Sequence, residues 1–316
     1  MSISAGNRAH ESRIDSSIIA PFIVFTLIWG STWLVIRGQI DTVAPQWSVA
    51  YRFAMAAVAM AAVAHWKGQS LRPTRGMLTV AAVVGISQFC FNFNGVYVAE
   101  LYITSGVVAT VFALLFIPNS LLAWALLGQR PSGRFAIGGA IAAAGISLLF
   151  VNELQSSDAT TGGVLAGLGL TLFGLLSASW ANVYQALETS RRQPLLAMLA
   201  WAMGIGALAD GLFAIAVAGP PTIDMSLGYW LGLTYLALAA SVLCFSLYLP
   251  VVRKIGPGRA AYSSVLVPVI AMGLSTMFED YRWSLLAVVG GLLALGGMLV
   301  ALSGNRGSKI AAPDAG

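Results

Sequence analysis

Charged side chains are scarce in this sequence, and their scarcity excludes most water-soluble folds. Only 9% of the 316 residues are Asp, Glu, Lys or Arg, whereas 58% are hydrophobic. Soluble domains average about 25% charged residues, and so few charges could not cover the surface of a soluble protein of this length. The sequence therefore predicts an integral membrane protein.

Residues that commonly carry catalysis or bind metals are equally few. Two histidines (His10 and His65) and two cysteines (Cys90 and Cys244) are present, and neither pair has metal-ligand spacing. The sequence has no Walker loop, no nucleophile elbow and no H-E-x-x-H motif. We predict no enzyme activity, no metal and no cofactor, and we expect both cysteines to be small buried hydrophobic residues.

Long apolar stretches predict ten transmembrane helices. A spanning helix needs about 20 mostly apolar residues. Two stretches hold one ionisable residue each, Arg52 in 47–66 and Asp210 in 195–218. Eight more hold no formal charge, namely 16–36, 76–99, 101–129, 135–152, 159–187, 225–252, 260–278 and 283–305. The predicted fold class is therefore all-α and integral to the membrane.

The basic residues sort by loop and predict an orientation. Outside loops hold only Arg37 and Arg282 when the loops are counted from a cytoplasmic N-terminus. Cytoplasmic segments then hold 14 of the 17 basic residues, namely Arg8, Arg13, Lys67, Arg72, Arg75, Arg130, Arg134, Arg191, Arg192, Arg253, Lys254, Arg259, Arg306 and Lys309. Because cytoplasmic loops carry an excess of Lys and Arg, both termini are expected in the cytoplasm. The charges do not gather on one soluble face, so no nucleic-acid partner is predicted.

The chain divides into two similar halves of five predicted helices, 17–152 and 164–303. Pro118 and Pro268 occupy matching positions in these halves, each eleven residues before a polar pair. Because five is odd, matching helices must cross the membrane in opposite directions, which predicts an inverted repeat of the kind found in many secondary transporters. The remaining ends are polar tails expected in the cytoplasm, 1–16 and 304–316.

Several motifs resemble the EamA-like family of the drug/metabolite transporter superfamily. They are Trp29-Gly30-Ser31, Tyr102-Ile103-Thr104-Ser105-Gly106, Pro118 and Gly128-x-Arg130. The resemblance covers nearly the whole chain and implies a ten-helix, basket-shaped exporter of small metabolites. The chain is similar to the branch that exports amino acids, including aromatic ones. It departs from the family at the end of the fourth helix, where Gln129 replaces the usual glutamate, whereas the second half keeps Glu279.

Ionisable residues inside a membrane are costly and are candidates for function. Arg52 and Asp210 lie in the second and seventh predicted helices, which match each other in the two halves. Either they interact across the halves as a charge relay or substrate clamp, or Arg52 extends outward and Asp210 lies near the outer interface. Glu100, at the outer end of the third helix, is expected at the rim.

Polar and aromatic residues at helical spacing predict the substrate-binding face. Gln88 and Asn92 share a face of the third helix, and Trp180 and Tyr184 share one of the sixth. Buried amides need partners in lipid, so they line either a cavity or a helix–helix contact. Aromatic faces attract ammonium groups, although tryptophan also gathers at membrane interfaces. The predicted substrate-binding residues are Trp29, Trp33, Gln88, Asn92, Asn94, Trp180, Tyr184, Ser246, Tyr248 and Tyr262.

The two prolines are predicted hinges. Pro118 and Pro268 each remove one helical hydrogen bond, so they either flex during transport or hold a static kink.

The sequence thus predicts a monomeric carrier in the inner membrane that exports amphiphilic metabolites, above all aromatic and bulky apolar amino acids, by alternating access. The alternatives are a broad-specificity drug or metabolite efflux carrier, an open channel or scramblase, and an enzyme acting on lipid-linked substrates. Proton coupling and facilitated export are both left open.

Overall fold

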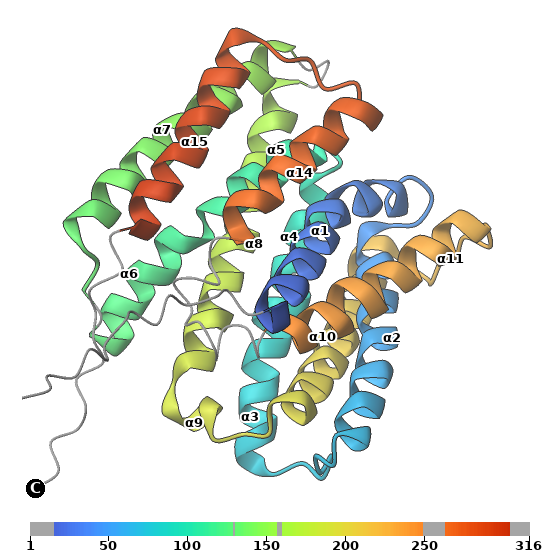
Figure 1. Cartoon of the computed structure of the whole chain (residues 1–316). Helices are drawn as coiled ribbons and strands as arrows, with labels where there is room; N and C mark the ends of the chain where they lie inside the picture. The colour runs from blue at the N-terminus through green and yellow to red at the C-terminus, as the bar shows by residue number, and fades with distance from the viewer. Residues whose placement is uncertain (1–15, 129, 157–159, 249–262, 304–316) are drawn as a thin grey trace, which may run out of the picture.

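The computed structural model describes residues 16–128, 130–156, 160–248 and 263–303, and every regular element within them is a helix (Figure 1). In chain order the elements are α1 (Ser16–Gln39), α2 (Pro45–Trp66), α3 (Arg75–Val84), η1 (Gly85–Asn92), α4 (Phe93–Ala99), α5 (Ser105–Phe112), η2 (Ala113–Leu115), α6 (Phe116–Leu127), α7 (Gly133–Ser156), α8 (Thr161–Ala186), α9 (Glu188–Arg191), α10 (Leu195–Ala218), α11 (Leu227–Thr234), η3 (Tyr235–Leu243), α14 (Ser263–Phe278) and α15 (Leu285–Ser303).

These elements join into long apolar helices. Eight of the helices are long and apolar enough to cross a membrane. Two further apolar helices, Leu266–Phe278 and Leu285–Ala301, are shorter. All ten overlap the segments predicted from the charge distribution, which confirms an all-helical fold of the membrane type over the described residues.

Local sequence signals set several helix ends. Thr74 and Thr160 precede α3 and α8, and their hydroxyls accept hydrogen bonds from Met77 N at 3.1 Å and Gly163 N at 3.2 Å. These bonds satisfy backbone donors that a helix start leaves without partners. Gly128 ends α6 in the left-handed region at φ +69°, a conformation that glycine adopts without strain.

Helices α7 and α15 cross in close antiparallel contact (Figure 1). Gly138 lies against Gly297, whereas Gly145, further along α7, lies against Gly290, nearer the start of α15. A Cβ added at Gly290 would come within 2.8 Å of the Gly145 carbonyl oxygen. The crossing therefore depends on the absence of side chains, as expected for small residues at four-residue spacing in membrane helices.

Helices α2 and α10 form a second antiparallel pair (Figure 1). Near the start of α2, Trp47 Nε1 donates to the carbonyl of Gly219 at the end of α10, at 3.2 Å. At the opposite end, Leu196 N at the start of α10 donates to Oε1 of Gln69, three residues beyond α2, at 3.0 Å. The second and seventh predicted helices thus pack along their whole lengths.

The two prolines have different surroundings. Pro118 lies at the start of α6, directly after the short 3₁₀ segment η2, so the fourth apolar helix is interrupted where the proline removes a hydrogen bond. Pro268 lies inside α14, which runs from Ser263 to Phe278 without interruption. The matching positions therefore carry a break in one helix and a continuous helix in the other.

Candidate transport site

Two π-helices occupy corresponding membrane spans. Within the third apolar helix lies η1 and within the eighth lies η3, and the two begin 150 residues apart, at Gly85 and Tyr235. π-Helices are rare and often occur at functional sites. Each of them lies beside a buried ionisable side chain, and in each case that side chain comes from the other half of the chain.

Asp210 supplies the charge beside η1. It lies on α10, which packs against η1, and its side chain is fully buried. Asn94 Nδ2 donates to Asp210 Oδ1 at 2.6 Å and to the carbonyl of Cys90 at 2.9 Å. Cys90 belongs to η1, so Asn94 connects the carboxylate to the backbone of the π-helix. The second carboxylate oxygen, Oδ2, is buried without a hydrogen-bond partner among the described residues.

Arg52 supplies the charge beside η3. Its Nη2 and Nε approach Oγ of Ser241, a residue of η3, at 3.3 and 3.4 Å, and Nη1 donates to the hydroxyl of Tyr97 at 3.2 Å. Ser241 Oγ in turn donates to the carbonyl of Leu236 at 2.9 Å. The guanidinium carbon lies 4.5 Å from the centre of the Phe93 ring, and such a contact contributes roughly 2 kcal/mol when it is desolvated.

Arg52 and Asp210 do not contact each other directly. Within the described residues, no ion pair or hydrogen bond joins the two side chains. Each is 3% exposed or less, so both side chains are buried within the protein. Both residues are held in the protein interior by polar groups of the π-helical spans.

An aromatic cluster forms where α1 meets the eighth apolar helix. The Trp29 and Tyr248 rings have their centres 5.2 Å apart, and Phe25 lies 5.4 Å from Tyr248. Trp29 Nε1 donates to the carbonyl of Ala240 in η3 at 3.1 Å. Ser246 Oγ is buried and has no hydrogen-bond partner among the described residues. The structure therefore brings together two of the predicted binding residues, Trp29 and Tyr248.

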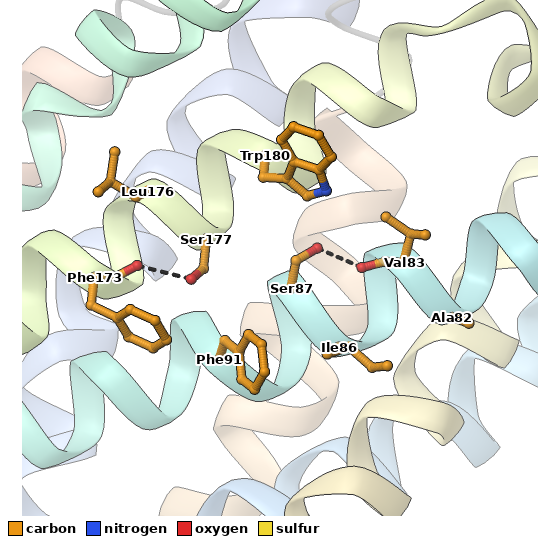
Figure 2. Close-up of a pocket in the computed structure, with 9 residues that line it drawn as sticks. All are labelled: Ala82, Val83, Ile86, Ser87, Phe91, Phe173, Leu176, Ser177 and Trp180. Atoms are coloured by element: carbon orange, nitrogen blue, oxygen red, sulfur yellow. Dashed lines mark hydrogen bonds between the residues drawn. The ribbon is translucent and has the colours of Figure 1, made fainter.

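A groove of about 540 Å³ lies between η1 and α8 (Figure 2). At one end the Phe91 and Phe173 rings lie 5.8 Å apart, and at the other Trp180 faces Ser87. The only side-chain oxygens in its lining belong to Ser87 and Ser177, and both hydroxyls donate to carbonyls of their own helices. The lining residues are Ala82, Val83, Ile86, Ser87, Phe91, Phe173, Leu176, Ser177 and Trp180. This lining is apolar and aromatic, with hydroxyls as its polar groups.

The other predicted binding residues lie apart from this groove. Trp33 is buried, with its ring centre 5.5 Å from that of Phe112, and Tyr184 packs against the main hydrophobic core. Gln88 and Asn92 each have a buried side-chain oxygen without a partner among the described residues. Tyr262 lies outside the described residues. Asn94 contacts Asp210, as described above.

Sequence reasoning did not identify Ser87, Tyr97 or Ser241 as site residues. Ser87 and Phe91 line the groove, whereas the predicted pair Gln88 and Asn92 does not. The prediction assumed 3.6 residues per turn and did not foresee the π-helix over Gly85–Asn92. Tyr97 and Ser241 carry no local signal, because only folding brings them to Arg52.

Long apolar helices with buried polar contacts between them define a helical membrane protein. The sequence matches the EamA-like transporter family over residues 17–151 and again over 163–303, and the chain belongs to that family. It is therefore a multi-pass membrane transporter of the drug/metabolite transporter type.

Relatives and a solved structure agree with this assignment. The chain is 31% identical over 274 residues to the "Uncharacterized inner membrane transporter YedA" of Escherichia coli K12, which covers 83% of this chain and 85% of that protein. It is 23% identical over 294 residues to the "Probable amino-acid metabolite efflux pump" of the same strain, covering 91% and 95%. A crystal structure of 19% sequence identity superposes with a TM-score of 0.66 over 92% of this chain and 99% of its own, which shows a shared fold.

Proposed function

We propose that this protein is a secondary transporter that exports small amphiphilic metabolites, most of all aromatic and bulky apolar amino acids, by alternating access. The observation that carries the proposal is the reciprocal contact in which each half places a buried charge beside the π-helix of the other half. Buried charges are costly in a membrane and mark transport pathways. Arg52 and Asp210 are the proposed charge relay.

An inverted repeat of two five-helix units, 17–152 and 164–303, is part of this proposal. An inverted repeat requires matching helices to run in opposite directions. In support, α2 runs antiparallel to α10, and α7 runs antiparallel to α15. The family matches the chain twice, over nearly the same two segments. The substrate cavity is proposed to lie between the two units, and Pro118 and Pro268 are the proposed hinges.

The chemistry of the groove favours an amphiphilic substrate with an aromatic or bulky apolar group. Trp180, Phe91 and Phe173 offer ring faces, which attract both aromatic side chains and ammonium groups. The groove lining contains no charged side chain, so it does not favour a multiply charged substrate. The name of the efflux-pump relative agrees with an amino-acid metabolite, and a broad-specificity efflux carrier is the second candidate.

The cellular setting follows from the charge distribution and the relatives. We propose an inner-membrane protein, as the name of the transporter relative states for that protein, with both termini in the cytoplasm. The 14 basic residues on the proposed cytoplasmic side support this orientation. The proposed partners are the lipid bilayer and an amino-acid-like substrate, the proposed working unit is a monomer, and no catalytic step is proposed.

Flux into proteoliposomes tests the proposal. Purified protein is reconstituted, and uptake of a radiolabelled aromatic amino acid is measured with unlabelled competitors, with and without a pH gradient. Saturable uptake that is accelerated by substrate on the opposite side is the expected result, because an alternating-access carrier exchanges substrates. Failure of every amino acid to compete would contradict the substrate class, and unsaturable flux would indicate a channel.

A further inference from the structure

A second polar cluster lies where the end of α4, the start of α5 and the end of α14 meet. Ser105, the first residue of α5, donates through Oγ to Oε2 of Glu279 at 2.7 Å. Ser275 of α14 donates through Oγ to the same oxygen. A Cβ added at Gly106 would lie 2.9 Å from the Ser275 Cβ, so α5 and α14 are in close contact here. Helices α5 and α14 are therefore held together at this point.

Glu100 lies in the same cluster and is fully buried. Its side chain is 0% exposed, and neither carboxylate oxygen has a hydrogen-bond partner among the described residues. Glu100 directly follows the last residue of α4, and burial removes its side chain from water, while its position at the membrane rim stays a prediction. A buried ionised carboxylate without partners would cost several kcal/mol, so the closed arrangement favours the protonated acid.

Three titratable or charged groups interact electrostatically with Glu100. They are Glu279 from the end of α14, Arg37 from α1 and Tyr97 from its own helix. Arg37 Nη1 donates to the backbone carbonyl of Glu100, and within the described residues neither glutamate forms an ion pair. Burial first, and the negative charge of Glu279 second, raise the pKa of Glu100, while Arg37 lowers it.

We propose that Glu100 is protonated in the closed conformation and that its proton locks the end of the transporter at which α5 meets α14. The inference rests on the proposed alternating-access function, because it assumes that this end opens during transport. Loss of the proton leaves a negative Glu100 carboxylate in a dry site, where it has no hydrogen-bond partner among the described residues. Its repulsion from Glu279 and its need for water then favour opening.

The direction of the pH effect follows from linkage. In the open conformation Glu100 is hydrated and titrates near the ordinary glutamate value of about 4.3, whereas in the closed conformation its pKa is raised. A proton on Glu100 therefore stabilises the closed conformation fully when the pH is below the ordinary pKa. This stabilisation is lost as the pH rises through the raised pKa of the closed conformation. For every unit of difference between the two pKa values of Glu100, the ratio of open to closed protein rises about tenfold as the pH passes from the lower pKa to the higher one.

Distances between spin labels test the lock without any substrate. Cysteines replace Leu101, beside Glu100, and Met277, on α14; both side chains are exposed, while the native Cys90 and Cys244 are buried and shielded from the label. Double electron–electron resonance is recorded on full-length protein in lipid nanodiscs from pH 5 to pH 9. In otherwise wild-type protein, a short distance at pH 5 should give way to a longer one as pH rises.

Variants separate the lock from other causes. Glu100→Gln, which mimics the protonated acid, should keep the short distance at every pH, and Glu279→Gln should reduce the open fraction at high pH. Glu188→Gln, at an exposed carboxylate on α9, should behave as wild type. A distance in wild-type protein that does not change with pH, or a Glu100→Gln variant that opens like wild type, would overturn the proposal.

The same measurement distinguishes failure of the lock from failure of the proposed function. If Asp210→Asn abolishes the distance change while Glu100→Gln preserves it, the proton site lies at Asp210 and the lock is refuted. If the distance change follows the expected pattern while no panel substrate gives saturable exchange flux, the lock stands and the proposed export function is contradicted.

Discussion

The crossing of α7 and α15 gives the sharpest structural test, because two adjacent glycines of α15 differ only in what they face. A methyl group at Gly290 would lie 2.8 Å from the Gly145 carbonyl oxygen and 3.0 Å from Leu149 N, both backbone atoms. A methyl group at Gly291 would meet nothing within 4 Å. Ala at position 290 therefore forces the helices apart, whereas Ala at position 291 does not.

The expected stability difference between Gly290→Ala and Gly291→Ala follows from two opposing effects. Inserting a methyl group into a packed contact costs about 1–3 kcal/mol, and Gly→Ala gains about 1 kcal/mol of helix propensity. The gain is common to Gly290→Ala and Gly291→Ala, so the difference between them isolates the close approach. We expect Gly290→Ala to be less stable than Gly291→Ala by about 1–3 kcal/mol.

Thermal unfolding in detergent measures this difference. Protein is heated in steps, and the fraction that remains monodisperse is followed by size-exclusion chromatography. Gly290→Ala should lower the midpoint relative to Gly291→Ala, and Gly145→Ala combined with Gly290→Ala should be non-additive because the two positions are in contact. Equal midpoints for Gly290→Ala and Gly291→Ala would refute the antiparallel glycine contact.

Three further predictions concern the candidate site. Tyr97→Phe should destabilise the protein by about 1.5–3 kcal/mol, since it removes a hydrogen bond from a buried cation; Tyr51→Phe, whose hydroxyl bonds a surface carbonyl, is the control in the same melting assay. Asp210→Asn should abolish any pH dependence of flux, and unchanged dependence would exclude Asp210 as the proton carrier. Trp180→Ala should weaken competition by aromatic amino acids about tenfold, the effect of roughly 1.4 kcal/mol. Trp124→Ala, similarly exposed at 48% against 44% but outside the groove, should leave competition unchanged.

The sequence predicted what is encoded locally along the chain. Ten apolar segments follow from the spacing of charges, because a membrane helix must exclude them over its whole length. Arg52 and Asp210 stood out for the same reason, and both are buried near the π-helices. The contacts of Arg52 with Tyr97 and Ser241, and of Asp210 with Asn94, could not be predicted, because only folding brings these side chains together. The π-helices were not predicted either, since they have no distinctive composition.

The reciprocal charge contacts also constrain which parts of the molecule move. If α2 slid relative to η3, Arg52 would lose Ser241, and if α10 slid relative to η1, Asp210 would lose the Asn94 donor. Each loss would remove a hydrogen bond from a buried charge, and such a bond contributes about 1.5–3 kcal/mol. Because both contacts cross between the halves, we expect α2, η1, α10 and η3 to move as one unit. We therefore expect the proposed opening to break the contacts between α5 and α14, which are linked by the hydrogen bonds of Ser105 and Ser275 to the Glu279 carboxylate.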